Sequence, residues 1–436
     1  MEVYYTFCFL AAISVFLGFL NQYVLRAQST IAITAGALAL SLLVTGMGKL
    51  GLVELHTWAD QLLPLMNLKD LLLKGMLGFL LFAGSLHIDL HMLRNQRLEI
   101  SLLVIAGTLI STLVVGALLY LFLQWVGLPV GLVYCLLFGA LISPTDPIAV
   151  LAILKNLKAP EQIAIQVEGE SLFNDGFGLV IFTVIYALAF GGEEPTVSAV
   201  AQLFAVEAVG GVLMGLFIGT LFHLLICATD DHSLELLLTL VIPTAGFSLA
   251  NLLGVSGALA MVVSGIIIGN FTRERGFSRM SQRELDNFWS ITEDFLNGLL
   301  FLLVGLFLIT INLNPFDYIL ILVAIVIVLL GRTAAVSIPF TLLKCRRKYH
   351  PYSERILIWG GLRGGLALAL ALAIPEGYAY IEGQDVRHLW VVMTYGVVLF
   401  SIVVQGSTIA PLIRRSSAIV EPEQSAEGAK QTKTRS

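Results

Sequence analysis

The sequence has 436 residues, of which 57% are hydrophobic and 13% are charged, and its formal net charge is −5. Soluble globular domains usually carry about 25% charged residues. This composition, with a mean hydropathy of +0.89, therefore excludes an ordinary water-soluble protein and indicates a chain that lies in a lipid bilayer. The small net charge gives no indication of nucleic-acid binding. The four cysteines show no metal-binding spacing, and we interpret them as apolar packing residues.

Thirteen apolar segments are candidates for helices that cross the membrane, because a span needs about 20 residues. In chain order they are 4–26, 30–48, 68–88, 98–127, 131–154, 162–190, 197–227, 233–252, 255–270, 288–311, 317–342, 354–375 and 389–413. We expect one transmembrane domain over 1–415 and a short, disordered cytoplasmic tail over 416–436. Since no soluble domain is expected, the sequence predicts neither an enzyme nor a cofactor.

The lysines and arginines test this count of spans. With thirteen spans and the N-terminus outside, 19 of the 25 basic residues lie on the inner side or in the tail, and four lie outside. Positive residues are enriched in the cytoplasmic loops of membrane proteins. An even number of spans would place both termini on one side and spoil this bias, so we predict an outside N-terminus and a cytoplasmic C-terminus.

The thirteen spans can be divided into six, one and six, which inverts the second half relative to the first. The fifth and twelfth spans occupy matching places and both contain helix-breaking residues, in "SPTDPIAV" at 143–150 and in "GGLRGG" at 360–365. An interrupted helix at membrane depth survives only where it is buried in protein or lines a cavity. The sequence therefore predicts an all-α membrane protein with two inverted six-helix repeats, a connecting helix, and broken helices 5 and 12 that cross at a binding site.

Ionisable residues inside spans are functional candidates, because each costs at least ~2.5–3.5 kcal/mol to insert. The sixth span is the richest: Glu170 and Asn174 are four residues apart, as are Ser171 and Asp175, so the pairs occupy adjoining faces of one helix. A polar seam between helices is one interpretation. The other is a cation site, since small hard cations prefer carboxylate, hydroxyl and carbonyl oxygens. Further charged residues within spans are Asp146, Glu168, Glu207, Arg332 and Arg363, whereas Glu293 and Asp294 lie near a span end and are interpreted as water-facing.

A buried carboxylate can hold either a proton or a cation, because low dielectric favours its neutral form and a bound cation favours its ionised form. We predict that Asp175 is this group. If only the loaded states cross the membrane, exchange follows without direct contact between the two ions. Because Asn174 beside it carries no charge, one titrating acid per cycle is expected, and one singly charged cation would be exchanged for one proton.

The charges at the broken helices suggest a different role. Helix ends carry partial charges of roughly +0.5 and −0.5, and Asp146 and Arg363 have the signs that would compensate them where the two broken helices cross. Direct contact with the transported ion is the alternative role for these two residues. Arg332 in the eleventh span needs a carboxylate partner, because an unpaired buried charge is costly. Glu170 is the partner that we predict, which leaves Asp175 free to titrate.

The chain resembles the monovalent cation:proton antiporter-1 family, specifically bacterial NhaP-type Na⁺/H⁺ antiporters. The resemblance rests on "SPTDPIAV", "EGESLFNDG", "GVSGALAMVVSGIIIGN", "FLNGLLFLLVGL", "WGGLRGGLALALAL" and "SIVVQGSTIAPL", between about residues 140 and 412. It implies a homodimer in the bacterial inner membrane that exchanges Na⁺ or Li⁺ for H⁺ without net charge, as in pH homeostasis. It also implies that Asp175 binds the ion and the proton with Asn174 as its partner, that Ser171 and the Thr145 main chain are further ion ligands, and that Glu170 and Arg332 form a salt bridge.

One position departs from the pattern, because Ala83 follows Phe82 in the third span where many relatives carry a glutamate. A missing ligand would affect the choice between Na⁺ and K⁺, so a K⁺/H⁺ antiporter of the same fold is an alternative. A passive cation channel is an alternative from another class, although one carboxylate cluster with inverted halves favours alternating access over a ring-lined pore. His87 and His91, four residues apart, are the candidates for a separate pH sensor on one helix face.

Overall fold

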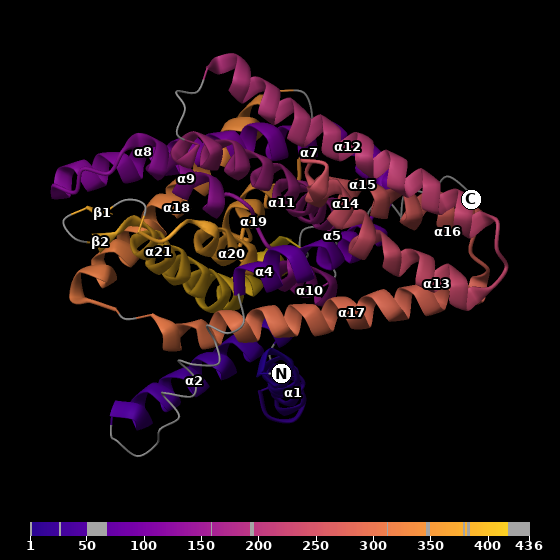
Figure 1. Cartoon of the computed structure of the whole chain (residues 1–436), viewed down its shortest axis with the longest axis horizontal. Helices are drawn as coiled ribbons and strands as arrows, with labels where there is room; N and C mark the ends of the chain where they lie inside the picture. Colours follow the sequence, from indigo (N-terminus) through magenta and orange to yellow (C-terminus); the bar gives the residue numbers. More distant parts are fainter. Residues whose placement is uncertain are drawn as a thin grey trace, which may run out of the picture.

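In the computed structural model the chain is a bundle of helices, most of which run roughly along the long axis of the molecule (Figure 1). The structure describes residues 2–25, 28–49, 68–157, 159–191, 196–311, 313–345, 349–377, 380–381 and 384–416. The predicted tail therefore lies outside the described residues from position 417 onward. Within the described part, each of the thirteen apolar segments is helical, and the fold class is the predicted one.

The first six segments form the following helices, where η marks a π-helical or 3₁₀ stretch: α1 (Glu2–Leu20), η1 (Asn21–Leu25), α2 (Ser29–Lys49), α4 (Leu68–Asp70), η2 (Leu71–Met76), α5 (Leu77–Leu86), α6 (Leu90–Asn95), α7 (Arg97–Leu102), η3 (Leu103–Gly107), α8 (Thr108–Val126), α9 (Leu132–Ile142), α10 (Ile148–Asn156) and α11 (Glu161–Phe190). α9 and α10 are the two halves of the fifth segment. They are separated by residues 143–147, which are not helical.

The remaining segments form α12 (Val197–Cys227), α13 (His232–Val241), η4 (Ile242–Gly246), α14 (Phe247–Leu252), α15 (Gly257–Ile267), η5 (Ile268–Thr272), α16 (Arg273–Arg275), α17 (Arg279–Leu306), η6 (Phe307–Thr310), α18 (Pro315–Lys344), α19 (Ser353–Trp359), α20 (Gly365–Ala373), α21 (Val386–Phe400), η7 (Ser401–Gln405) and α22 (Gly406–Thr408). Residues 410–416 are also helical. Two short strands, β1 (Tyr380–Ile381) and β2 (Gln384–Asp385), form an antiparallel pair between α20 and α21.

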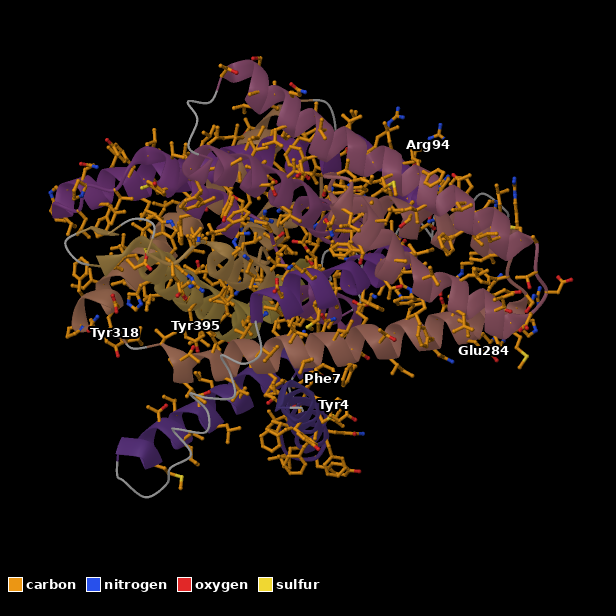
Figure 2. All side chains as sticks on the ribbon, viewed as in Figure 1. Tyr4, Phe7, Arg94, Glu284, Tyr318 and Tyr395 are labelled. Carbon is orange, nitrogen blue, oxygen red and sulfur yellow. The ribbon has the colours of Figure 1, made fainter. Side chains whose placement is uncertain are left out.

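Apolar side chains lie in two kinds of place. Some are buried between the helices and hold them together, and others are exposed on the outer helices, where lipid would contact them. Large residues such as Trp390, Phe138 and Phe301 are fully buried between α9, α17, α20 and α21. Others remain exposed on the outer helices: Tyr4 on α1 is 69% exposed and points away from the bundle in Figure 2. Exposed aromatic and aliphatic side chains are costly in water but not in a bilayer, which fits the membrane environment indicated by the composition.

The helices differ from the prediction in length and in where they begin. Nine helices in the described part of the chain are long and apolar enough to cross a membrane. The segments predicted at 68–88, 131–154, 255–270 and 354–375 are shorter or interrupted helices, so the total of thirteen spans stays a prediction. α17 begins at Arg279, nine residues before the predicted start. Its first turns are amphipathic and therefore lack the uninterrupted apolar run by which the span was located.

The prediction that His87 and His91 share one helix face is wrong. α5 ends at Leu86, and α6 begins at Leu90. The side chain of Asp89 accepts hydrogen bonds from the backbone N–H groups of His91 (2.7 Å) and Met92 (3.1 Å) and thereby starts the new helix. His87 is the C-cap residue of α5 and His91 lies in the first turn of α6, so the two histidines do not share one helix and their sequence spacing does not set their geometry.

Candidate functional site: a cavity that ends at two crossed broken helices

The two interrupted helices meet at their breaks. The backbone N–H of Asp146, in the break between α9 and α10, donates a 2.8 Å hydrogen bond to the carbonyl oxygen of Leu362, in the break between α19 and α20. The chains approach so closely that a Cβ on Gly364 would lie 2.3 Å from Oδ2 of Asp146. A larger residue at position 364 would therefore displace the Asp146 side chain, and the two halves of the chain are joined at this crossing.

Asp146 lies at the positive ends of two half-helices. Its Oδ1 accepts a 3.0 Å hydrogen bond from the N–H of Ile148, the first residue of α10. Its Oδ2 faces Gly364, directly before the first residue of α20. A carboxylate at a helix N-terminus is stabilised by the unpaired N–H groups and by the helix dipole, so the geometry suits compensation of both ends.

The negative ends are served by two different arginines. Nη1 of Arg363 donates hydrogen bonds to the carbonyl oxygens of Ser143 (3.0 Å) and Pro144 (3.2 Å), which follow the last turn of α9. Arg332 donates through Nε (3.1 Å) and Nη2 (2.7 Å) to the carbonyl of Leu357, in the last turn of α19. The sequence had suggested Arg363 for this role, whereas the contact between Arg332 and α19 was not foreseen.

Arg332 also contacts Glu170. The two form a bidentate ion pair, with Nη1 donating to Oε1 and Nη2 donating to Oε2 at 2.9 Å, and both residues are buried. Gly361 makes room for the guanidinium, because a Cβ there would lie 2.3 Å from Nε of Arg332. Glu170 on α11, Arg332 on α18 and the carbonyl of Leu357 on α19 thus form one connected group.

A cavity of about 470 Å³ reaches the crossing. Its walls come from η2 and α5, from α10, from α11, from α17 and from the start of α20. The charged or titratable residues that line it are Asp146, Glu168, Asp175, Glu293, Asp294, Lys155 and His87. Acidic groups therefore predominate over basic ones in the described lining, and such a cavity attracts cations.

Asp175, like Glu168 on the same helix, lines this cavity, whereas Glu170, Ser171 and Asn174 do not. Asp175 is only partly buried, and it interacts electrostatically with Asp146 and Arg363. Among the described residues, none donates a hydrogen bond to its carboxylate. The group thus lies in the wall of the cavity, beside the crossed breaks.

Asn174 and Ser171 face the protein interior and are not part of the cavity lining. Oδ1 of Asn174 accepts a 2.7 Å hydrogen bond from Thr108 of η3–α8, and its Nδ2 donates to the carbonyl of Ser143 at 3.3 Å. The hydroxyls of Ser171 and Thr145 are 3.0 Å apart. Thr145 itself lines the cavity. Asn174 and Ser171 therefore contact the fifth helix where it is interrupted, next to Asp175.

Three other positions were singled out in the sequence. Glu168 lines the cavity, whereas Glu207 on α12 does not. Ala83 on α5 is buried and is also not part of the lining, although its neighbour Gly84 is.

The sequence did not predict that α17 contributes to the cavity. Glu293 and Asp294 line the cavity, together with Asn297. Glu293 and Asp294 precede the apolar part of their span and were therefore interpreted as water-facing, so the sequence did not indicate that they line a cavity.

Known proteins with similar sequences support this assignment of the fold. Residues 62–415 match the family described as sodium/hydrogen exchanger, transmembrane. The chain is 42% identical over 425 residues to the Na⁺/H⁺ antiporter NhaP of Pseudomonas aeruginosa, covering 96% of this chain and 98% of the relative. It is 38% identical to the Na⁺/H⁺ antiporter NhaH of Halobacillus aidingensis, covering 78% of this chain and 81% of the relative.

Among solved structures, the sodium proton antiporter MjNhaP1 from Methanocaldococcus jannaschii at pH 8 has a similar fold, with a TM-score of 0.74 and 20% sequence identity. The match covers 95% of this chain and 99% of that chain. The family match spans most of the sequence, including the crossed helices and the cavity walls. The chain therefore belongs to the sodium/hydrogen exchanger family.

Proposed function

We propose that the protein exchanges Na⁺ for H⁺ across a cell membrane, one for one, with Asp175 as the group that holds either ion. The observation that carries the proposal is the position of Asp175: a carboxylate without a hydrogen-bond donor among the described residues, in the wall of an acidic cavity, beside two interrupted helices. The similar proteins are named Na⁺/H⁺ antiporters, and for this reason we propose Na⁺ and not K⁺ as the cation.

The neighbouring groups define what each ion would meet. A cation at Asp175 would find the carboxylate and the oxygens of Thr145, with Ser171 behind Thr145 at 3.0 Å. These are the hard oxygen ligands that small cations prefer. Protonation removes the negative charge that holds the cation, so the two ions compete for one site. Asn174 supports the site through Thr108 and the Ser143 carbonyl without adding charge.

Alternating access requires that the loaded site faces the two sides of the membrane in turn. The cavity lies between α5 and α17 on one hand and the crossed helices with α11 on the other. Relative movement of these two groups would close the cavity and expose Asp175 on the opposite side. We assign the wall of the cavity that carries His87 and Lys155 to the cytoplasmic side, because Lys155 is among the basic residues that the positive-inside rule puts on the inner side. A homodimer is part of this proposal.

The test is ion-induced proton movement in proteoliposomes that contain a pH-sensitive dye. Addition of Na⁺ to vesicles with an acidic interior should release the dye quenching, Li⁺ should act similarly, and K⁺ should act weakly. A K⁺/H⁺ antiporter would reverse this order. A passive cation channel would instead transport labelled Na⁺ without stoichiometric counterflow of protons, and that result would refute the proposal.

A further inference from the structure

One face of α17 contributes a second set of oxygen atoms to the cavity. Ser290, Glu293, Asp294 and Asn297 all line it. Residues three, four and seven positions apart lie on one side of an α-helix, so these four side chains form a continuous polar stripe. α17 is a different wall from α11, and the stripe is therefore separate from the Ser171–Asp175 segment.

Asn297 lacks the partner that a buried amide normally has. The residue is only 4% exposed, and its Oδ1 accepts no hydrogen bond from any residue that the structure describes. Burying an amide without compensation is unfavourable, and such atoms are rare in native proteins. Because Asn297 lines the cavity, its carbonyl oxygen, unpaired within the described part of the chain, is a free ligand atom at the cavity wall.

Glu293 supplies a charge near this ligand atom. It is one turn before Asn297, and it interacts electrostatically with Asp294, Glu168 and Asp146, all of the same sign, and with Lys155. The ion pairs of the described residues do not include Glu293, whereas Glu170 is paired with Arg332. A free carboxylate among other carboxylates is stabilised by a cation close to it.

We propose that Glu293 and Asn297 form a recruitment site for a partly hydrated monovalent cation on the α17 wall of the cavity, from which the ion passes to Asp175. A carboxylate oxygen and an amide oxygen one helical turn apart, with Ser290 and Asp294 on the same face, provide hard ligands but too few to replace the whole hydration shell. The inference rests on the proposed cation exchange, and it assigns to α17 the role of raising the cation concentration next to the exchange site.

The first experiment compares Glu293→Gln with Glu284→Gln. Both changes remove one negative charge from α17 without changing size, but Glu284 does not line the cavity and lies near the N-terminal end of the helix (Figure 2). Exchange is measured in everted and right-side-out membrane vesicles over a range of Na⁺ concentrations. Glu293→Gln should raise the apparent half-saturation constant about threefold to tenfold for Na⁺ on the cavity side, and it should leave the maximal rate unchanged.

Glu284→Gln should behave like the parent protein. Raising the ionic strength with choline chloride should reduce the difference between parent and Glu293→Gln, because screening weakens attraction over more than about 10 Å. An unchanged half-saturation constant in Glu293→Gln, with normal exchange by the parent, would refute the recruitment site and leave the proposed function intact. Absence of exchange in the parent would refute the proposed function itself.

The second experiment measures equilibrium binding of labelled Na⁺ to purified protein in which Asp175 has been changed to Asn. The recruitment site predicts weak residual binding that disappears when Glu293→Gln or Asn297→Ala is added, but not when Glu284→Gln is added. Absence of residual binding in Asp175→Asn, or residual binding that survives Glu293→Gln, would contradict the proposal. Thermal unfolding of each variant shows whether it is folded, and the conservative Glu293→Gln keeps the test valid if Asn297→Ala is unstable.

Discussion

Glu170 and Asp175 lie on the same helix, five residues apart, yet their surroundings are opposite. Glu170 is buried and held by both ends of the Arg332 guanidinium, whereas Asp175 is partly buried in the cavity wall and has no donor among the described residues. A carboxylate that is held by two hydrogen bonds to one guanidinium keeps a fixed position. A carboxylate that lines a cavity can exchange one positive ion for another, and in the proposed function Asp175 carries the ions whereas Glu170 stabilises the fold.

The largest effect is expected from removing the free acid. Asp175→Asn should abolish Na⁺/H⁺ exchange while the protein remains folded and inserted, because the amide has nearly the same size but can carry neither ion. Glu161→Gln, at the exposed start of the same helix, is the matched control and should retain parental exchange. Substantial exchange by purified Asp175→Asn in proteoliposomes would show that another group carries the ions.

Removing either partner of the buried Glu170–Arg332 ion pair should lower the stability of the folded protein. Glu170→Ala or Arg332→Ala should lower the free energy of unfolding by about 3–5 kcal/mol, because each leaves a buried charge without its partner. Thermal and denaturant unfolding in detergent measure this loss, and the double variant should recover part of it. The exposed pair Lys344–Glu354 provides the control: Lys344→Ala should cost at most about 1 kcal/mol. Equal losses at both pairs would mean that burial does not matter here.

Competition between ions sharpens the contrast at Asp175. With equal pH on both sides, lowering the pH by one unit should raise the apparent half-saturation constant for Na⁺ about tenfold, in the range where the carboxyl is mostly protonated. The maximal rate should fall at high pH, because the return step needs a protonated site. A half-saturation constant that stays flat while the maximal rate changes would mean that a separate group senses pH.

The smallest expected effect is on charge movement. If Asp175 is the one group that changes its ion, each cycle moves no net charge, and a membrane potential of 100 mV, worth about 2.3 kcal/mol per charge, should not alter the exchange rate. Rates at clamped potentials and currents on a solid-supported membrane measure this. A current proportional to the transport rate would refute the one-for-one ratio. Asn174→Asp is an unsuitable test, because it would place a carboxylate oxygen against the Ser143 carbonyl.

The sequence was most informative where chemistry restricts the backbone. The prolines around Asp146 and the glycines around Arg363 predicted two interrupted helices at matching positions, and the structure has both interruptions at a crossing. The sequence predicted that Arg332 pairs with Glu170, because a buried arginine needs a carboxylate partner. The two residues are in contact in the structure. Their functional roles, like those of Asp175, Asn174, Ser171 and Thr145, remain proposals.

Side-chain direction could not be obtained from the sequence in the same way. Helical spacing places Asn174 and Asp175 on adjoining faces. It does not show that Asn174 is hydrogen-bonded to Thr108 whereas Asp175 faces a cavity. Glu293 was interpreted as water-facing because it precedes the apolar part of α17. It does face an aqueous space, but that space leads to Asp175, and only the packing of α17 beside α5 and α20 creates it.

The ion pair and the crossing also constrain the order in which the protein is made. Arg332 follows Glu170 by 162 positions, and Arg363 follows Ser143 by 220. While the ribosome is still producing the second half, α11 lies in or near the bilayer without the basic partner of Glu170, which is unfavourable there. The first half therefore lacks its buried ion pair until α18 has been made. Insertion of a truncated chain should end in a product without an exchange site, exposed to the quality-control proteases of the membrane.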